Sequence, residues 1–244
     1  MLHIFGDSFS IPHAHMKEVF GPDKTEVTYL PLEKSWTTIV SDAISNDPHT
    51  NYAILGCSND YIYQQLREKE LLFKSGDRVI IQLTNLYREW FFENKPYMAV
   101  HMATQMTPGV DITEQEYAAL EMYKRHLYSE RRLILHYHTL LDALTLRTKL
   151  YGEQNIKCLI LPGFHNIQGI EGNLCEASGS EFDNEKTSMA YHEKTGDNRF
   201  NHFSEVNHKI LASKIINFFN TGESIDLTSG FKTSIMTKEI LETC

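Results

Sequence analysis

The sequence predicts a three-layer α/β/α sandwich around a central parallel sheet. Short, continuous apolar runs alternate with segments whose apolar residues recur at helical spacing. Continuous apolar runs are typical of strands covered on both faces, as in a parallel sheet. Strand, helix and strand in succession imply right-handed crossovers. With 244 residues, the chain is long enough to bury a core without a disulfide or a metal.

Four apolar runs are the predicted strands. The first two are closed by glycine, the third follows a Ser-Gly-Asp turn signal, and the fourth stops at Pro-Gly. The predicted strands are Leu2–Phe5, Tyr52–Leu55, Arg78–Leu83 and Lys157–Leu161.

Helical periodicity follows or precedes each of these runs. Helices are predicted to begin at Ser35 and at Asn59, the second carrying its apolar pattern as far as Phe73. Thr113 begins a capping box, and the pattern after it continues to Gly152 as one very long helix or as two in series. Ser204 is the predicted N-cap of the last core helix.

One domain is expected to span residues 1–220, with insertions at about 86–112 and 163–201 that lack core periodicity. Aromatic residues around Trp90 in the first insertion suit either a substrate cleft or a satellite core. The C-terminal tail, 221–244, is weakly amphipathic and suits a packed terminal helix or a contact for a partner.

Charge and composition exclude several classes of function. The formal net charge is -9, without a basic stripe, so the chain repels nucleic-acid backbones and anionic membrane surfaces. No run approaches the roughly 18 apolar residues of a membrane span, and no basic region precedes a long apolar stretch at the N-terminus. The four cysteines show no CxxC pairing and are expected to be reduced. The expected location is therefore cytoplasmic, with a virus-encoded origin left open.

Histidine spacing gives no reason to expect a metal. The pairs His13/His15 and His136/His138 are spaced like metal ligands only on a strand, and the second pair lies in a helical pattern. We expect these to be surface or core histidines, with no metal site. No P-loop or dinucleotide glycine fingerprint is present.

Ser8 is the candidate nucleophile. It follows the first predicted strand directly, at the carboxyl edge where open α/β sheets place their ligands. A turn in which Asp7 or Ser8 caps the next segment is the alternative. His202 stands just ahead of the last predicted helix and would supply the base that a hydroxyl nucleophile needs. A capping or solvated histidine is the alternative for His202.

These residues resemble the blocks of the SGNH hydrolases, also called GDSL-like esterases and lipases. The blocks occur in family order over most of the chain. Gly6–Ser8 is similar to the first block, Asn51–Gly56 to the second, Val79–Asn85 to the third, and His202–Ser204 with Asn207–His208 to the fifth.

The resemblance implies an SGNH-type, flavodoxin-like fold and a set of roles. Ser8 would be the nucleophile and His202 its base. The backbone N–H groups of Ser8 and Gly56, with the side-chain amide of Asn85, would form the oxyanion hole. Asn59 is a competing amide donor, because Ser58-Asn59 also lies at the sheet edge.

The sequence also departs from the family pattern. Leu83 and Leu86 stand where the third block has glycine and aspartate, and Arg199 occupies the usual acid position three residues before the histidine. Asp197 is the nearest carboxylate and the candidate acid, and a Ser–His dyad is the alternative.

The implied function is a serine hydrolase that removes a short acyl group, acetyl above all, from a polar small molecule or carbohydrate ester. No metal or organic cofactor is implied, and no oligomeric state is predicted. Two alternatives remain: a non-catalytic SGNH-like binding or structural protein whose site has decayed, and an acyltransferase or thioesterase on the same fold.

Overall fold

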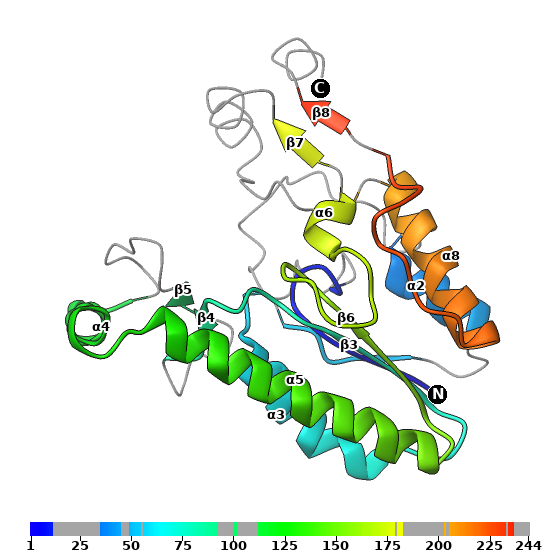
Figure 1. The fold of residues 1–244 in the computed structure, drawn as a ribbon, viewed down its shortest axis with the longest axis horizontal. Helices are drawn as coiled ribbons and strands as arrows, with labels where there is room; N and C mark the ends of the chain where they lie inside the picture. The colour runs from blue at the N-terminus through cyan, green and yellow to red at the C-terminus, as the bar shows by residue number, and fades with distance from the viewer. Residues whose placement is uncertain are drawn as a thin grey trace.

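A four-stranded parallel sheet forms the centre of the molecule (Figure 1). The computed structural model describes residues 1–11, 35–44, 49–54, 56–91, 100–101, 112–178, 180–182, 203, 205–232 and 234–236. The strand order is β2-β1-β3-β6, which is the order that begins a flavodoxin-like sheet. The strands are β1 (Leu2–Phe5), β2 (Thr50–Asn51), β3 (Arg78–Gln82) and β6 (Lys157–Leu161).

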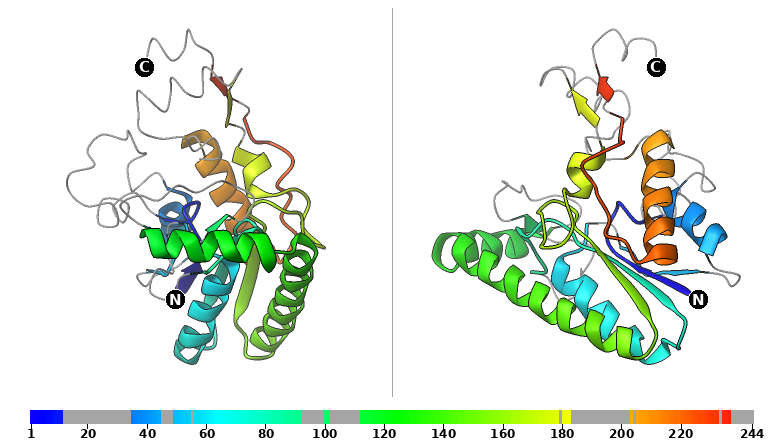
Figure 2. Two further views of the ribbon diagram at one scale, coloured as in Figure 1. Left: turned by 90° about the vertical axis from the view of Figure 1, so that its left-hand side faces the viewer. Right: turned by 45° about the vertical axis from the view of Figure 1, so that its right-hand side comes forward.

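Helices cover both faces of this sheet (Figures 1 and 2). Helices α2 (Trp36–Ile44) and α8 (Glu205–Thr221) pack on one face, and α3 (Asn59–Lys69) and α5 (Glu130–Glu153) pack on the other. Successive strand residues alternate between the two: Ile4 joins the core beneath α2 and α8, whereas Phe5 joins the core beneath α3 and α5. The predicted three-layer sandwich is confirmed.

The predicted strands match the structure except at β2. β1 and β6 have the predicted bounds, and β3 stops one residue earlier, at Gln82. The second strand was placed wrongly at Tyr52–Leu55, since β2 is Thr50–Asn51. The N–H of Tyr52 still donates to the Ile4 carbonyl of β1 at 2.7 Å, and the N–H of Ile54 donates to the carbonyl of Gly6, just after β1, at 3.0 Å. The N–H of Ala53, however, donates to the Asn51 side chain, which ends the regular strand.

The helix starts are confirmed where the structure describes them. α2 begins at Trp36, and α3 begins at Asn59 with Ser58 as its N-cap. A 3₁₀ turn over Glu70–Leu72 follows α3, so Phe73 lies beyond the helix. The predicted cap Ser204 lies outside the described residues.

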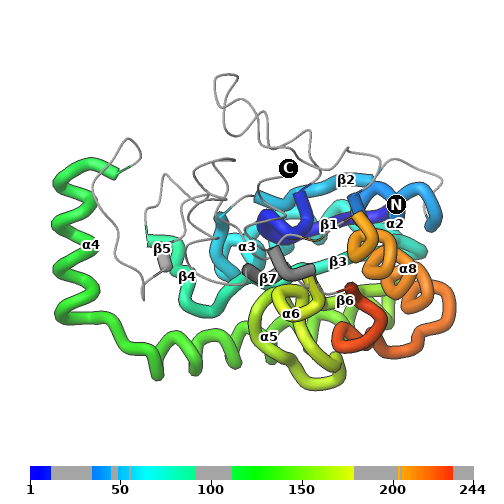
Figure 3. The backbone as a smooth tube through the Cα atoms, turned by 90° about the horizontal axis from the view of Figure 1, so that it is seen from above, coloured from blue at the N-terminus to red at the C-terminus, as the bar shows by residue number. Residues whose placement is uncertain are grey.

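The long helical pattern forms two helices in series. α4 (Glu114–His126) begins with the predicted capping box at Thr113, and α5 follows after a short break. α4 projects away from the sheet (Figure 3). Phe91 packs beside α4 against Ile112 and Leu120, so this aromatic belongs to a satellite core.

Smaller elements complete the described chain. Leu174 and Ala177 of α6 (Leu174–Ser178) are buried in the main core, which corrects the expectation that the stretch from 163 to 201 stays outside it. After α8, Ile225 and Leu227 are also buried there, in residues 222–232 that hold no helix. The remaining elements are β4 (Arg88–Glu89) paired with β5 (Val100–His101), α6 (Leu174–Ser178), and β7 (Ser180–Phe182) paired with β8 (Ser234–Met236).

The turn after β6 leaves no room for a side chain at Gly163. A Cβ there would press into the carbonyl oxygen of Leu83, at the end of β3. We expect Gly163→Ala to lower the free energy of unfolding by about 1–3 kcal/mol, the usual effect of overpacking. Gly152→Ala is the matched control, because a Cβ at this helical position meets nothing within 4 Å and should stabilise by about 0.5–1 kcal/mol. Equal urea midpoints for Gly163→Ala and the wild type would contradict this packing.

Candidate active site

The carboxyl ends of the parallel strands bring polar side chains together at one edge of the sheet. Asp7 and Ser8 follow β1, Thr84 and Asn85 follow β3, and His165 follows β6. In this strand order the chain leaves β1 and β3 in opposite directions, which makes their ends the topological switch point. Ligands of open α/β sheets bind at this point.

Asp7 is fully buried and its carboxylate is fully committed. One oxygen accepts the backbone N–H of Phe9 at 3.1 Å. The other accepts the Thr84 hydroxyl at 2.5 Å and the Arg88 guanidinium at 3.0 Å. Arg88 also donates to the Thr84 hydroxyl at 2.9 Å. The capping role considered for Asp7 is therefore correct, and this residue joins the ends of β1 and β3.

The Gln82 side chain also holds the loop that follows β1. Its Oε1 accepts the backbone N–H of Asp7 at 2.9 Å and the hydroxyl of Ser10 at 3.0 Å, while its Nε2 donates to the Leu83 carbonyl at 2.5 Å. A Cβ at Gly6 would lie 2.5 Å from Gln82 Oε1. A larger residue at this position would displace the glutamine amide from its hydrogen bonds with Asp7 and Ser10.

Ser8 differs from its neighbours in that its side chain is half-buried and uncommitted. Asp7, Phe9 and Ser10 are all buried and hydrogen-bonded. None of the residues that the structure describes forms a hydrogen bond with the Ser8 hydroxyl. A rigid loop therefore presents this hydroxyl at the switch point.

The two candidate amide donors have different environments. Asn59 uses both ends of its amide on the backbone after β3: its Oδ1 accepts Thr84 N–H at 2.8 Å, and its Nδ2 donates to the carbonyls of Thr84 and Asn85. Asn85 Oδ1 accepts Tyr87 N–H at 2.9 Å. Its Nδ2 has no hydrogen-bond partner within the described ranges. Asn85 therefore has a free donor at the sheet edge, and Asn59 does not.

Gly56 and Cys57 follow β2 at the same edge. Gly56 has φ of 69°, in the left-handed region that favours glycine. The Cys57 thiol is buried and donates to the Gly6 carbonyl at 3.4 Å. Burial raises the pKa of this thiol far above its ordinary value, so it stays protonated and does not compete with Ser8 as a nucleophile.

The predicted base and acid, His202 and Asp197, lie outside the described residues. His208, from the same sequence block, is described: its Nδ1 accepts the N–H of Trp36 at the first turn of α2, at 3.2 Å. Trp36 in turn donates from its indole to the Phe9 carbonyl at 2.7 Å. His208 thus caps α2 and links α8 to the loop that carries Ser8.

Sequence reasoning missed two residues of this edge. Arg88 was assigned to an insertion, although it pairs with Asp7. His165 was also assigned to an insertion, yet its Nε2 lies 3.4 Å from Asn85 Oδ1. Its position two residues after the Pro-Gly that ends the fourth predicted strand is the signal that could have found it.

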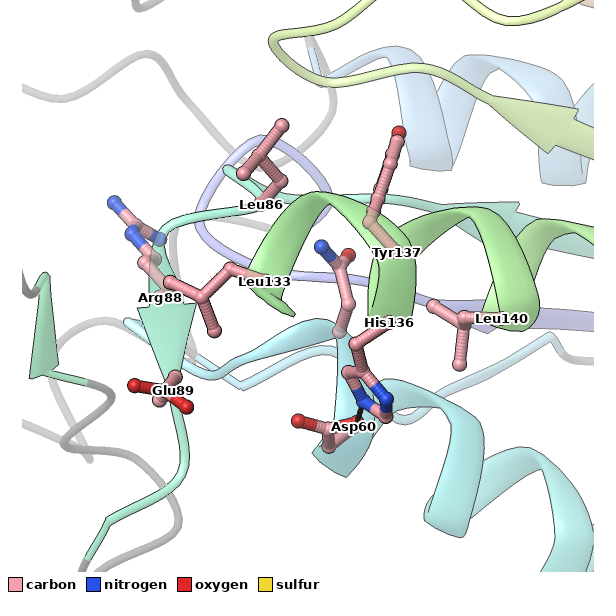
Figure 4. Close-up of a pocket in the computed structure, with 9 residues that line it drawn as sticks. Asp60, Leu86, Arg88, Glu89, Leu133, His136, Tyr137 and Leu140 are labelled. Carbon is pink, nitrogen blue, oxygen red and sulfur yellow. Dashed lines mark hydrogen bonds and ion pairs between the residues drawn. The ribbon is translucent and has the colours of Figure 1, made fainter. Parts of the chain in front are cut away.

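A small pocket lies beside this edge, between α3, β4 and α5 (Figure 4). Asp60 and His136 are paired in it at 2.6 Å. Burial raises the pKa of Glu89 on the opposite wall.

His136 and His138 are exposed on α5, as expected for surface histidines. Among the described residues, no cluster of three or more His, Cys, Asp or Glu side chains could hold a metal.

Comparisons with known proteins show a distant likeness to a solved structure. No family model matches the chain, and no curated protein does. A solved structure of a member of the lipolytic protein G-D-S-L family from Veillonella parvula DSM 2008 is similar, at 15% identity and a TM-score of 0.35, over 90% of this chain and 98% of that one. The strand order and the packing of helices on both faces of the sheet identify the fold. In the described part of the chain, no helix has the length and apolar character to cross a membrane.

Arg88 should be required for stability because it compensates a buried charge. Arg88→Met leaves the Asp7 carboxylate without its cation, and we expect a loss of about 3 kcal/mol, the lower end for a broken buried pair, because Arg88 keeps some contact with water. Urea unfolding measures this. Arg67→Met is the control, because the Arg67 side chain is exposed and its partner Glu70 keeps a second cation, Arg147, so this pair should contribute at most about 1 kcal/mol. Adding Asp7→Asn to Arg88→Met should recover part of the loss, and a further additive loss would contradict the pairing.

Proposed function

We propose that the chain is a serine hydrolase of the SGNH type. It removes a short acyl group, such as acetyl, from a polar substrate such as a carbohydrate ester. The observation that carries this proposal is the Ser8 hydroxyl, half-buried and uncommitted among the described residues, on a loop fixed by Asp7 and Gln82 at the switch point. A hydroxyl without another hydrogen-bond partner at this place can donate its proton to a general base and attack a substrate.

The proposed reaction has two steps. His202 takes the proton of Ser8 as Oγ attacks the ester carbonyl, and the tetrahedral intermediate collapses when the same proton passes to the leaving alcohol. Water, deprotonated by His202, then attacks the acyl-enzyme, and the proton returns to Ser8 as the acid leaves. Asp197 orients His202, or the pair acts as a dyad.

Negative charge on the carbonyl oxygen is stabilised by the N–H groups of Ser8 and Gly56 and by Asn85 Nδ2. The free Nδ2 supports the choice of Asn85, and the double commitment of Asn59 to the backbone after β3 argues against the alternative. The left-handed backbone at Gly56 supports a close approach there.

Covalent labelling tests the nucleophile. A fluorophosphonate should label one site per chain at neutral pH, with the adduct on Ser8 by mass spectrometry, because a hydroxyl that shares its proton with a base is nucleophilic. Turnover of p-nitrophenyl acetate should rise with pH through the titration of a histidine, near pKa 6.5 if unperturbed.

Ser8→Ala should remove both signals and change stability by no more than about 1–2 kcal/mol, since its hydroxyl forms no hydrogen bond with the described residues. The matched control is Ser213→Ala, an exposed serine on α8, which should keep both signals. Labelling at another serine, or turnover that survives Ser8→Ala, would refute the mechanism. No labelling and no turnover would favour the non-catalytic binding protein.

Kinetic measurements should distinguish the roles of Asn85 and Asn59. Asn85→Ala should lower kcat by about 10²–10³-fold, as loss of an oxyanion donor does elsewhere, with the urea midpoint little changed. Asn59→Ala leaves the buried N–H of Thr84 unpaired and should lower stability by about 1–3 kcal/mol, with the smaller effect on kcat. The opposite pattern would move the donor role to Asn59.

A further inference from the structure

We propose that His165 is a positioning residue that sets the orientation of the Asn85 amide, so that Nδ2 faces the oxyanion. This inference rests on the proposed function for its catalytic consequence, but the contact itself can be tested without turnover. His165 belongs to none of the sequence blocks considered above.

The amide of Asn85 has a defined orientation because of its neighbours. The backbone N–H of Tyr87 can only donate, so the Asn85 atom 2.9 Å from it must be the carbonyl oxygen. The same oxygen lies 3.4 Å from His165 Nε2. His165 must therefore carry its proton on Nε2 and donate it to this oxygen.

Rotation of the amide by 180° would turn its NH₂ group toward both donors. The Tyr87 N–H would then lose its acceptor and face a second donor, and His165 could pair with the NH₂ group only after its proton moved to Nδ1. Tyr87 and His165 together therefore hold Nδ2 on the opposite side, where it has no partner within the described ranges. A preorganised donor of this kind is what an oxyanion hole requires.

Aromatic neighbours hold the His165 ring in place. Tyr87 and Tyr137 both lie with ring centroids 6.0 Å from it, at interplanar angles of 80° and 66°. Tyr137 is buried on α5, and its hydroxyl points away from the Asp60–His136 pair (Figure 4). Burial lowers the pKa of His165 below its ordinary value. At neutral pH the ring is thus uncharged, with a single N–H to place.

The backbone around His165 is anchored to the end of β3. Gly163 packs against the Leu83 carbonyl, and the N–H of Leu83 donates to the Leu161 carbonyl at 2.8 Å. The first turn of α6 holds the other side, because Leu174 N–H donates to the Pro162 carbonyl at 2.8 Å. The ends of β3 and β6 therefore move as one unit, which keeps His165 and Asn85 in register.

The kinetic test compares two replacements of His165. His165→Phe keeps an aromatic ring but has no donor, and it should lower kcat for p-nitrophenyl acetate by about 10-fold with KM unchanged, the effect expected of one neutral hydrogen bond. His165→Gln can still donate an N–H and should recover kcat to within about 3-fold of the wild type. In an Asn85→Ala background, His165→Phe should cause no further loss.

A merely structural role predicts another result. Both variants would then lower kcat and stability in parallel, and the losses would add in the double variant. If His165→Phe abolished fluorophosphonate labelling of Ser8 as fully as His202→Ala does, His165 would be the base itself. Either result would overturn the positioning role.

Nuclear magnetic resonance tests the contact independently of activity. Long-range ¹H–¹⁵N spectra at neutral pH should show His165 as the neutral Nε2–H tautomer, in the wild type and in Ser8→Ala alike. The Asn85 NH₂ signals should shift in His165→Phe and stay close to the wild type in His165→Gln. An Nδ1–H tautomer would overturn the inference, whereas an inactive protein with the expected tautomer would overturn only the proposed function.

Discussion

A buried negative charge organises the whole edge of the sheet. The Asp7 carboxylate is fully enclosed, so it is tolerated only where cations and hydrogen-bond donors surround it. Arg88, Thr84 and the Phe9 amide supply that environment, and each must hold its position to do so. Because Arg88 begins β4 and Thr84 follows β3, one carboxylate determines how three segments meet. These hydrogen bonds fix the position of Ser8, although the Ser8 side chain makes none of them.

Most strands and helices could be predicted from the sequence because residue patterns within each segment determine them. Continuous apolar runs define β1 and β6, and Ser58 and Thr113 mark helix starts with their own hydroxyl groups. The second strand is predicted too late in the chain because the apolar residues Tyr52 and Ile54, which follow β2, continue its hydrogen bonding in part, while the Asn51 side chain interrupts the regular ladder. That interruption is a polar contact which hydrophobic patterning does not report.

The candidate site could be predicted only in part, because only its local features are visible in the sequence. A serine directly after a strand is visible in the sequence, and so are two asparagines near strand ends. The sequence could not choose between Asn59 and Asn85, because the choice depends on which amide the backbone after β3 consumes. Arg88 and His165 were missed because their partners are 81 and 80 residues away in the chain. Their roles depend on the strand order, which brings β1, β3 and β6 side by side.

The short β2 also has a consequence for how molecules meet one another. In the described sheet β2 is an edge strand, and an exposed edge invites a strand from another molecule to add to it. The N–H of Ala53, which does not face β1, donates to Asn51 Oδ1. Asn51 Nδ2 in turn donates to the Ser10 carbonyl at 2.6 Å. A neighbouring chain would find that hydrogen-bonding position already filled. The contact that shortens the strand thus also protects this edge against intermolecular β-sheet growth.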